Sequence, residues 1–298
     1  MQYHRGHLAS AWDHLSKSQA LYREEEHKKN PHDPGIEVHE YLALTAWQLG
    51  MADTARARMH EAIRLADRIR KPFELARSSF YAAYLHALLR DPQAAQRYAE
   101  KAFEYSTEYS IPLYLDASRM VYGWAIAQQG RCTEGVAFSC AAVESYKAAG
   151  NRVAIGSFLG FLAEALWSAG SPDEAMAAVE QGFSLAPREP MDISCLWGLK
   201  GKLLLEDVAP GSTAQILPSA KSRLEEAEKC FRKAIAVAAD IGAKGYELRS
   251  ATSLGRLLAT SGRATEARAI VKPLLKSLQE GLDTQDLIDA HQLMEELG

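Results

Sequence analysis

The sequence predicts an all-α fold, an α-α superhelix built as a right-handed solenoid of about six helical hairpins with a C-terminal capping helix. Three observations predict it. From position 50 onward, a turn residue, a small residue five places later and another seven after that recur every forty residues. Apolar residues are spaced by three and four positions throughout, as on one face of a helix. Alternating β-branched runs, which mark strands, are almost absent.

Small side chains occupy three fixed places in each forty-residue unit. The turn positions are Gly50, Arg90, Gly130 and Gly170. The small residues are Ala55, Ala95, Gly135 and Ala175 after the turn, Ala62, Ala102, Ala142 and Gly182 further on, and Ala43, Ala83, Gly123 and Ala163 before it. Two antiparallel helices need small residues where their axes cross closely, because a larger group would separate the backbones. Each unit is therefore predicted to be a helical hairpin.

The N-terminal segment, residues 1–30, is predicted to form a partial repeat. Its sequence RGHLASAWDHLSKSQALY resembles the second helix of a hairpin whose first helix is missing. The segment NPHDPG, at positions 30–35, is predicted to be a short linker because it is rich in turn-forming residues. The helical repeats are then expected to run from 36 to 281.

Two of the turns carry the signal of a helix start. Asp91-Pro92 and Ser171-Pro172 place an oxygen acceptor before a proline at the first helical position, where a missing N–H costs nothing. Both acceptors are therefore expected to cap the second helix of their hairpins.

The forty-residue period is interrupted once. The turn glycines Gly170 and Gly262 are 92 residues apart, which is two repeats plus twelve residues. The excess falls in EDVAPGSTAQILPSAKS, whose composition predicts a surface loop at 207–219, inserted between the two helices of one hairpin. The pattern resumes at Ala227, and Ala267 follows forty residues later.

The last segment, residues 282–298, is predicted to be a single capping helix. Leu287, Ala290, Met294 and Leu297 lie on one face of that helix. A lone amphipathic helix at the end of a repeat array closes it by covering the apolar side of the final hairpin.

Composition and charge exclude several classes of protein. Apolar residues make up 47% of the 298 residues and charged residues 24%, as in an ordinary soluble chain. The net charge of −4 disfavours nucleic acid as a partner, because phosphate binding requires a basic surface. No apolar stretch reaches the length of a membrane span, and no secretory signal is evident. The four cysteines form no CxxC pair, and we expect reduced thiols in a cytoplasmic protein.

Motifs for catalysis, cofactors and metals are missing from the sequence. It contains no phosphate-binding loop, no G-x-S-x-G and no H-E-x-x-H. His4, His7 and His14 could share a helical face, but no carboxylate or cysteine joins them at ligand spacing, so a solvated helix is expected rather than a metal site. We predict no catalytic residue, no cofactor and no metal. A hydrolase or transferase site assembled from distant repeats stays open as a third alternative.

The small residues of the helix–turn–helix unit resemble the tetratricopeptide repeat, here in a variant of about forty residues. The stretch HDPGIEVHEYLALTAWQLG, the region around KCFRKAIAVAADIGAKGYELRSATSLGRLLATSG and the closing EGLDTQDLIDAHQLMEEL resemble the C-terminal repeat region of bacterial multidomain signalling ATPases. Many of those proteins are classed as adenylate or guanylate cyclases or as transcriptional regulators. Nothing in this chain matches their catalytic domains, so the resemblance implies only sensing or docking.

By the same resemblance, certain positions on the first helix of each hairpin point into the hollow of the superhelix. They lie one and four residues after the small residue of that helix, and three and six residues before it. The predicted groove residues are Glu40, Trp47, Arg77, Phe80, Tyr84, Met120, Trp124, Glu164, Trp167, Lys202, Arg249 and Arg256. Rings flanked by a few charges suit a groove that binds a peptide. The alternative is that individual rings pack against the neighbouring repeat.

These observations predict a non-catalytic helical-repeat module for protein–protein interaction or sensing, which is the C-terminal part of, or is derived from, a bacterial signalling ATPase or cyclase-type regulator. The alternative is a stand-alone receptor that encloses a peptide or a small molecule in its concave groove. The sequence names neither the partner nor the oligomeric state.

Overall fold

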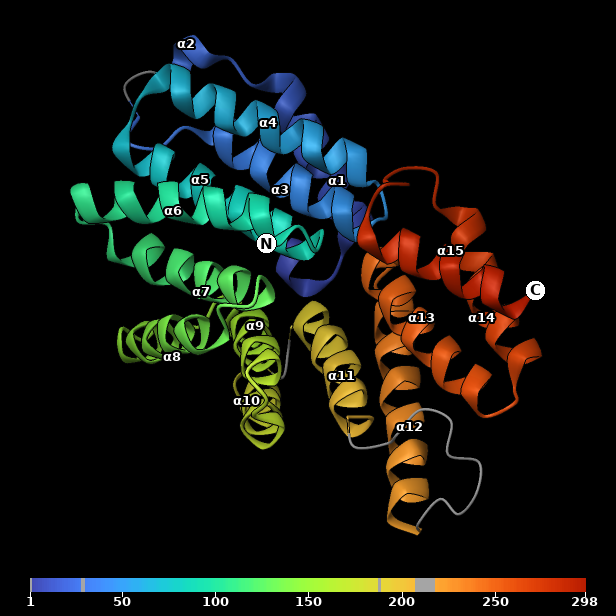
Figure 1. The fold of residues 1–298 in the computed structure, drawn as a ribbon. Coiled ribbons are helices and arrows are strands. Elements are labelled where there is room, and N and C mark those ends of the chain that lie inside the picture. The colour runs from blue at the N-terminus through green and yellow to red at the C-terminus, as the bar shows by residue number, and fades with distance from the viewer. Residues whose placement is uncertain (1, 28–29, 187–188, 207–217) are drawn as a thin grey trace.

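The computed structural model describes residues 2–27, 30–186, 189–206 and 218–298, and within them every regular element is a helix (Figure 1). Six hairpins follow one another along the chain, each made of two antiparallel helices. Their helices are α3 (Pro34–Gln48) with α4 (Ala52–Ile69), α5 (Pro72–Leu88) with α6 (Pro92–Glu108), α7 (Pro112–Gln128) with α8 (Cys132–Ala148), α9 (Ile155–Ser168) with α10 (Pro172–Leu185), α11 (Pro190–Leu204) with α12 (Pro218–Asp240), and α13 (Lys244–Thr260) with α14 (Ala264–Ser277). The predicted α-α superhelix is confirmed.

The small residues lie where the helices of a hairpin cross. Ala43, Ala55 and Ala62 in the first hairpin are fully buried. In the third hairpin, a methyl group added to Gly123 would lie 2.6 Å from the carbonyl oxygen of Gly135. Such contacts leave no space for a side chain, so the predicted role of these positions is confirmed.

The turn positions adopt the left-handed backbone conformation that glycine tolerates best. Gly130 has φ 91° and the other turn glycines are similar. Arg90 occupies the same position in the second hairpin with φ 60°. A non-glycine residue there carries about 1 kcal/mol of backbone strain, so Arg90 makes this turn less stable than glycine would.

One of the two expected helix caps forms. The carboxylate of Asp91 accepts a hydrogen bond from the backbone N–H of Ala94 at 3.0 Å. Ser171 makes no such side-chain bond, so that part of the expectation was wrong; Pro172 still begins α10 at the predicted place.

The N-terminal helix α1 (Leu8–Leu21) packs against α3, as the second helix of a preceding hairpin would. A short helical turn, η1 (Tyr3–Arg5), comes before α1, and α2 (Glu24–His27) follows it. Tyr3 is buried, with its ring edge-on to Tyr41 of α3, and η1 also contacts α11. The N-terminal segment therefore joins the first hairpin to the fifth.

The C-terminal helix α15 (Gln285–Leu297) packs on α13 and α14 with Leu287, Ala290 and Leu293 buried. Met294 and Leu297 are partly buried against the same cluster. The predicted loop at 207–219 lies almost entirely outside the described residues, and α12 begins at Pro218.

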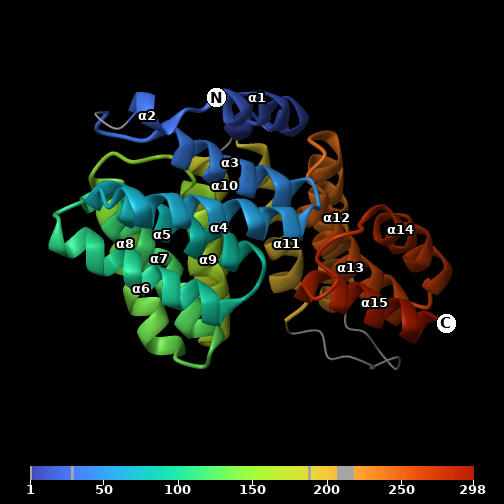
Figure 2. The ribbon, with the colours of Figure 1, turned by 90° about the horizontal axis from the view of Figure 1, so that it is seen from above.

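The superhelix closes on itself, which the sequence did not predict. Figures 1 and 2 show the C-terminal helices beside the turns of the first two hairpins. The backbone N–H and hydroxyl of Thr54 donate to Glu280 at 2.8 and 3.0 Å, and Arg56 pairs with Asp283 at 2.8 Å. The rings of Trp47 and Tyr246 meet at 4.9 Å. We call these links between residues 47–90 and 244–289 the ring-closing contact.

Candidate functional site

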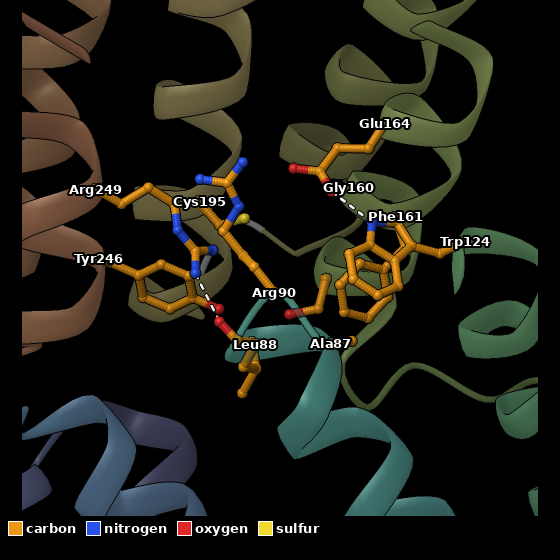
Figure 3. A pocket seen from close by; sticks show the side chains of 11 residues that line it. Ala87, Leu88, Arg90, Trp124, Gly160, Phe161, Glu164, Cys195, Tyr246 and Arg249 are labelled. Carbon is orange, nitrogen blue, oxygen red and sulfur yellow. Dashed lines mark hydrogen bonds between the residues drawn. The ribbon is translucent and has the colours of Figure 1, made fainter. Parts of the chain in front are cut away.

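The first helices of five successive hairpins surround a small hollow inside the ring (Figure 3). Two adjoining pockets share Glu164, Cys195, Tyr246 and Arg249, and together we call them the inner hollow. Its walls come from the end of α5 and from α7, α9, α11 and α13. Residues far apart in the sequence therefore meet there because each repeat presents its first helix to the inside.

The inner hollow is shallow. The space that a water molecule can enter in each pocket, which we call the floor, is about 20 Å³ and has room for roughly one water molecule. Including the part open to solvent, the empty space is about 390 Å³ in one pocket and about 350 Å³ in the other. The tip of a side chain or of a chain end fits this floor.

Aromatic rings form one wall of the hollow. Trp124 lies at 5.4 Å from Phe161, centroid to centroid, and its indole N–H donates to the carboxylate of Glu164 at 2.5 Å. Tyr246 faces them from α13 (Figure 3). The indole fixes the direction of the Glu164 carboxylate, so this wall is rigid and carries one negative charge.

Cations line the opposite side. The guanidinium of Arg249 pairs with both oxygens of Asp286 at 2.7 to 3.2 Å and donates to the backbone oxygen of Leu88 at 2.6 Å. Arg90 reaches Asp289 at 3.1 Å and Asp286 at 3.5 Å. Burial alone would raise the pKa of Asp286, but Arg249 and Arg90 outweigh it and hold that pKa below its ordinary value. The cations of the hollow are thus tied to the ring-closing contact.

Lys202 is the exception among these cations. Its side chain is half-buried, and no described residue gives its ammonium a hydrogen bond or an ion pair. Burial lowers the pKa of Lys202; Glu164 opposes this, and the neighbouring Arg90 and Arg249 lower it further. The ammonium therefore lies in the hollow without a directly paired carboxylate, and Glu164 and Asp286 compensate its charge only in part.

Four of the predicted groove residues line the inner hollow, namely Trp124, Glu164, Lys202 and Arg249. The structure brings these together from four different hairpins. Sequence periodicity found them because Trp124, Glu164 and Lys202 each lie one residue after the small residue of their helix, and Arg249 lies six residues before it.

The other predicted residues lie outside the hollow. Trp47 packs on Tyr246 and Arg249 in the ring-closing contact. Trp167 donates its indole N–H to Glu206, and Arg256 is exposed. The remaining five are buried between helices: Glu40, Arg77, Phe80, Tyr84 and Met120.

The buried charges among them have partners of their own. The guanidinium of Arg77 lies 3.1 Å from Glu40 and 3.1 Å from Glu74, which places one cation between two carboxylates of α3 and α5. Ser78 donates to Glu40 at 2.8 Å. Tyr84 donates its hydroxyl proton to Ser157 at 3.0 Å. The Arg77 and Ser78 contacts hold the first two hairpins together, and the bond between Tyr84 and Ser157 joins the second hairpin to the fourth.

Sequence reasoning missed Arg90, Phe161, Tyr246 and Asp286. The sequence pattern marks Arg90 only as a turn residue and places Asp286 only within the capping helix. The sequence does carry a signal for Arg90, because it stands where the other repeats have glycine. An arginine at a left-handed turn position costs backbone strain, which points to a role for its side chain.

The one thiol among the described residues that line the hollow, Cys195, does not suit nucleophilic catalysis. Burial raises the pKa of the Cys195 thiol to about 12, so the thiol stays protonated at neutral pH. Within the described ranges, no three His, Cys, Asp or Glu residues are placed to hold a metal ion. None of the described helices is both long and apolar enough to cross a membrane.

No protein-family model and no curated protein matches the chain. Its fold is similar to that of the apo form of RapI, with a TM-score of 0.57 and 12% identity, over 99% of this chain and 95% of that one. It is also similar to that of a Rap protein complexed with competence and sporulation factor, with a TM-score of 0.57 and 11% identity, over 96% of this chain and 77% of that one. At such identities the similarity concerns the fold.

Proposed function

We propose that the protein is a non-catalytic helical-repeat module that binds an extended segment of a partner protein in the inner hollow. The observation that carries the proposal is the convergence of Trp124, Glu164, Lys202 and Arg249 from successive hairpins onto one concave surface. Rings supply contact area at little entropic cost, and charges select the partner. The similarity in fold to a Rap protein that was solved with competence and sporulation factor supports ligand binding by this architecture.

The size of the hollow favours a peptide segment over an enclosed small molecule. Sites for small molecules usually enclose several hundred Å³, whereas the floor of each pocket here holds about one water molecule. An extended segment needs to insert only one or two groups and can lie along the repeats for the rest of its length. The stand-alone receptor for a small molecule is therefore the less favoured alternative.

The cellular setting suggested by the sequence is a bacterial signalling ATPase or cyclase-type regulator. That setting rests on the sequence resemblance alone. Cloning the gene with its flanking region tests it, because the hypothesis requires an ATPase or cyclase domain in the same reading frame or the same operon.

Binding is tested with dodecapeptides selected from a displayed random library on the full chain. Trp124→Phe is expected to weaken the selected peptides about tenfold, or about 1.4 kcal/mol, because the indole edge and its hold on Glu164 are lost. Trp167→Phe is the matched control, since Trp167 also donates to a carboxylate but does not line the hollow. Fluorescence anisotropy gives the dissociation constants. Equal affinity for both variants and the wild type would place the binding surface elsewhere.

A further inference from the structure

The carboxylates at the start of α15 occupy the position of a ligand for the cations of the hollow. Asp286 and Asp289, one helical turn apart, lie within 3.5 Å of Arg90, which also lines the hollow. They come from a segment almost two hundred residues further along the chain. These contacts within the chain thus show that the arginine side of the inner hollow binds carboxylates.

Arg90 is retained at a structural cost. Its φ of 60° is one that the turns within the first, third, fourth and sixth hairpins reach with glycine, although Arg70, Ser110 and Ala154 have a similar φ between hairpins. Strained residues persist where the side chain has a role that a relaxed residue could not fill. The exposed fraction of its side chain is 37%, so the guanidinium stays accessible from solvent while it contacts Asp286 and Asp289.

The cations and carboxylates around the hollow are equal in number, but one cation is left out of the direct pairs. Three cations face it, and Asp286 serves both Arg249 and Arg90. Glu164 is engaged by the indole of Trp124. Lys202 has no ion pair or hydrogen bond among the described residues, although Glu164 and Asp286 attract it from further away, and a partly buried cation without a direct partner is unfavourable. A carboxylate brought by a partner would correct this.

We propose that Asp286 and Asp289 are an internal substitute for an acidic partner segment, whose carboxylate binds Lys202 and Arg90 in the inner hollow and displaces α15 from Arg90. The inference rests on the proposed function and names the chemistry of the segment. A carboxylate oxygen is of the size that the floor of the hollow accommodates. Binding of the acidic segment and the Arg90 part of the ring-closing contact therefore exclude each other.

The carboxylate can come from an aspartate or glutamate side chain or from the C-terminus of the partner. Four mixtures of N-acetylated decapeptides separate these sources: neutral residues with an amidated end, neutral residues with a free carboxylate end, and each of these with one glutamate. The amount of each mixture retained by the purified full chain is measured by mass spectrometry after gel filtration. We expect at least one carboxylate-bearing mixture to be retained about tenfold more than the neutral amidated one.

Two pairs of variants test the displacement. Asp289→Asn removes a competitor and is expected to raise retention of the acidic mixture about two- to fivefold, the size of a surface ion pair. Asp283→Asn is its control, because Asp283 pairs with Arg56 in the ring-closing contact away from the hollow. Arg90→Gly removes the guanidinium and relieves the backbone strain. It is expected to lower retention of the acidic mixture several-fold. Arg70→Gly is its control, since Arg70 has φ 59° but does not line the hollow.

Each outcome decides between the ideas. Equal retention of acidic and neutral mixtures would overturn the inference and leave the proposed function standing. The same gain from Asp289→Asn and Asp283→Asn would also overturn it, because general loosening of the ring would then be the cause. If no mixture is retained, both the inference and the proposed function fail. Glycine tolerates the positive φ of both Arg90 and Arg70, so neither variant is expected to unfold and the two can be compared directly.

Discussion

Replacing Arg249 with methionine is expected to destabilise the protein by about 3 kcal/mol at pH 7. The guanidinium binds both oxygens of Asp286 and the carbonyl oxygen of Leu88. The side chain of Asp286 is only 11% exposed, so removal of its main cation leaves a carboxylate with little access to water. Methionine keeps much of the length and bulk of arginine, so the change isolates the charge and the hydrogen bonds.

The magnitude follows from the partners that remain. Removal of one member of a buried ion pair costs about 3 to 5 kcal/mol. Arg90, 3.5 Å from Asp286, still compensates part of the charge, which favours the lower end of that range. A loss of this size is a large part of the total stability of a typical domain.

The destabilisation is also expected to depend on pH. Because the folded pKa of Asp286 is below its ordinary value, the carboxylate stabilises the fold above its unfolded pKa of about 3.9, and this contribution is lost as pH falls through the folded pKa. The difference between Arg249→Met and the wild type should therefore be largest at neutral pH and shrink below about pH 4.

Urea unfolding followed by circular dichroism measures this at pH 7 and in acid. Arg256→Met is the control, because Arg256 is exposed on the same helix. The double variant Arg249→Met with Asp286→Asn should recover part of the loss, since no unpaired carboxylate remains. A free energy of unfolding for Arg249→Met within about 0.5 kcal/mol of the wild type at pH 7 would refute the reasoning.

Three further predictions follow from the packing and the charges. Gly123→Ala should lower the free energy of unfolding by about 1 to 3 kcal/mol, because the added methyl would lie 2.6 Å from the Gly135 carbonyl oxygen; urea unfolding unchanged from the wild type would contradict the close crossing. Truncation after Gly281 should expose the apolar side of the last hairpin and promote association in gel filtration; a monomer with unchanged melting would refute the capping role of α15. Lys202→Met should raise the melting temperature at neutral pH, because the folded pKa of Lys202 is lowered and its charged form therefore costs stability below that pKa. That gain should shrink as pH approaches about 10.4, the ordinary pKa of lysine, and a gain that persists at higher pH would have another cause.

The repeat architecture could be predicted because it is local and periodic. The small residues recur at a fixed interval, and each acts within its own hairpin, as Gly123 and Gly135 do. Trp124 and Glu164 were identified for the same reason, since an interval of forty places equivalent positions side by side in adjacent repeats.

Closure of the ring could not be predicted, because it depends on small rotations that accumulate over six hairpins. Trp47 occupies the same repeat position as Trp167, yet it packs on Tyr246 because the last hairpin returns to the first. Thr54 and Glu280 are 226 residues apart, and no local pattern links them. The contact between Arg90 and Asp286 could not be predicted for the same reason, because it forms only when the ring closes.

Titration of the ¹⁵N-labelled protein with a selected peptide, followed through the five tryptophan indole N–H resonances, tests most directly whether a segment binds in the inner hollow. Trp124 lines the hollow, whereas Trp197 lies outside it, against Phe183 and Lys233. Binding in the hollow predicts that the indole resonance of Trp124 shifts in proportion to the bound fraction while that of Trp197 stays in place. A shift of Trp197 with an unchanged Trp124 would contradict the account.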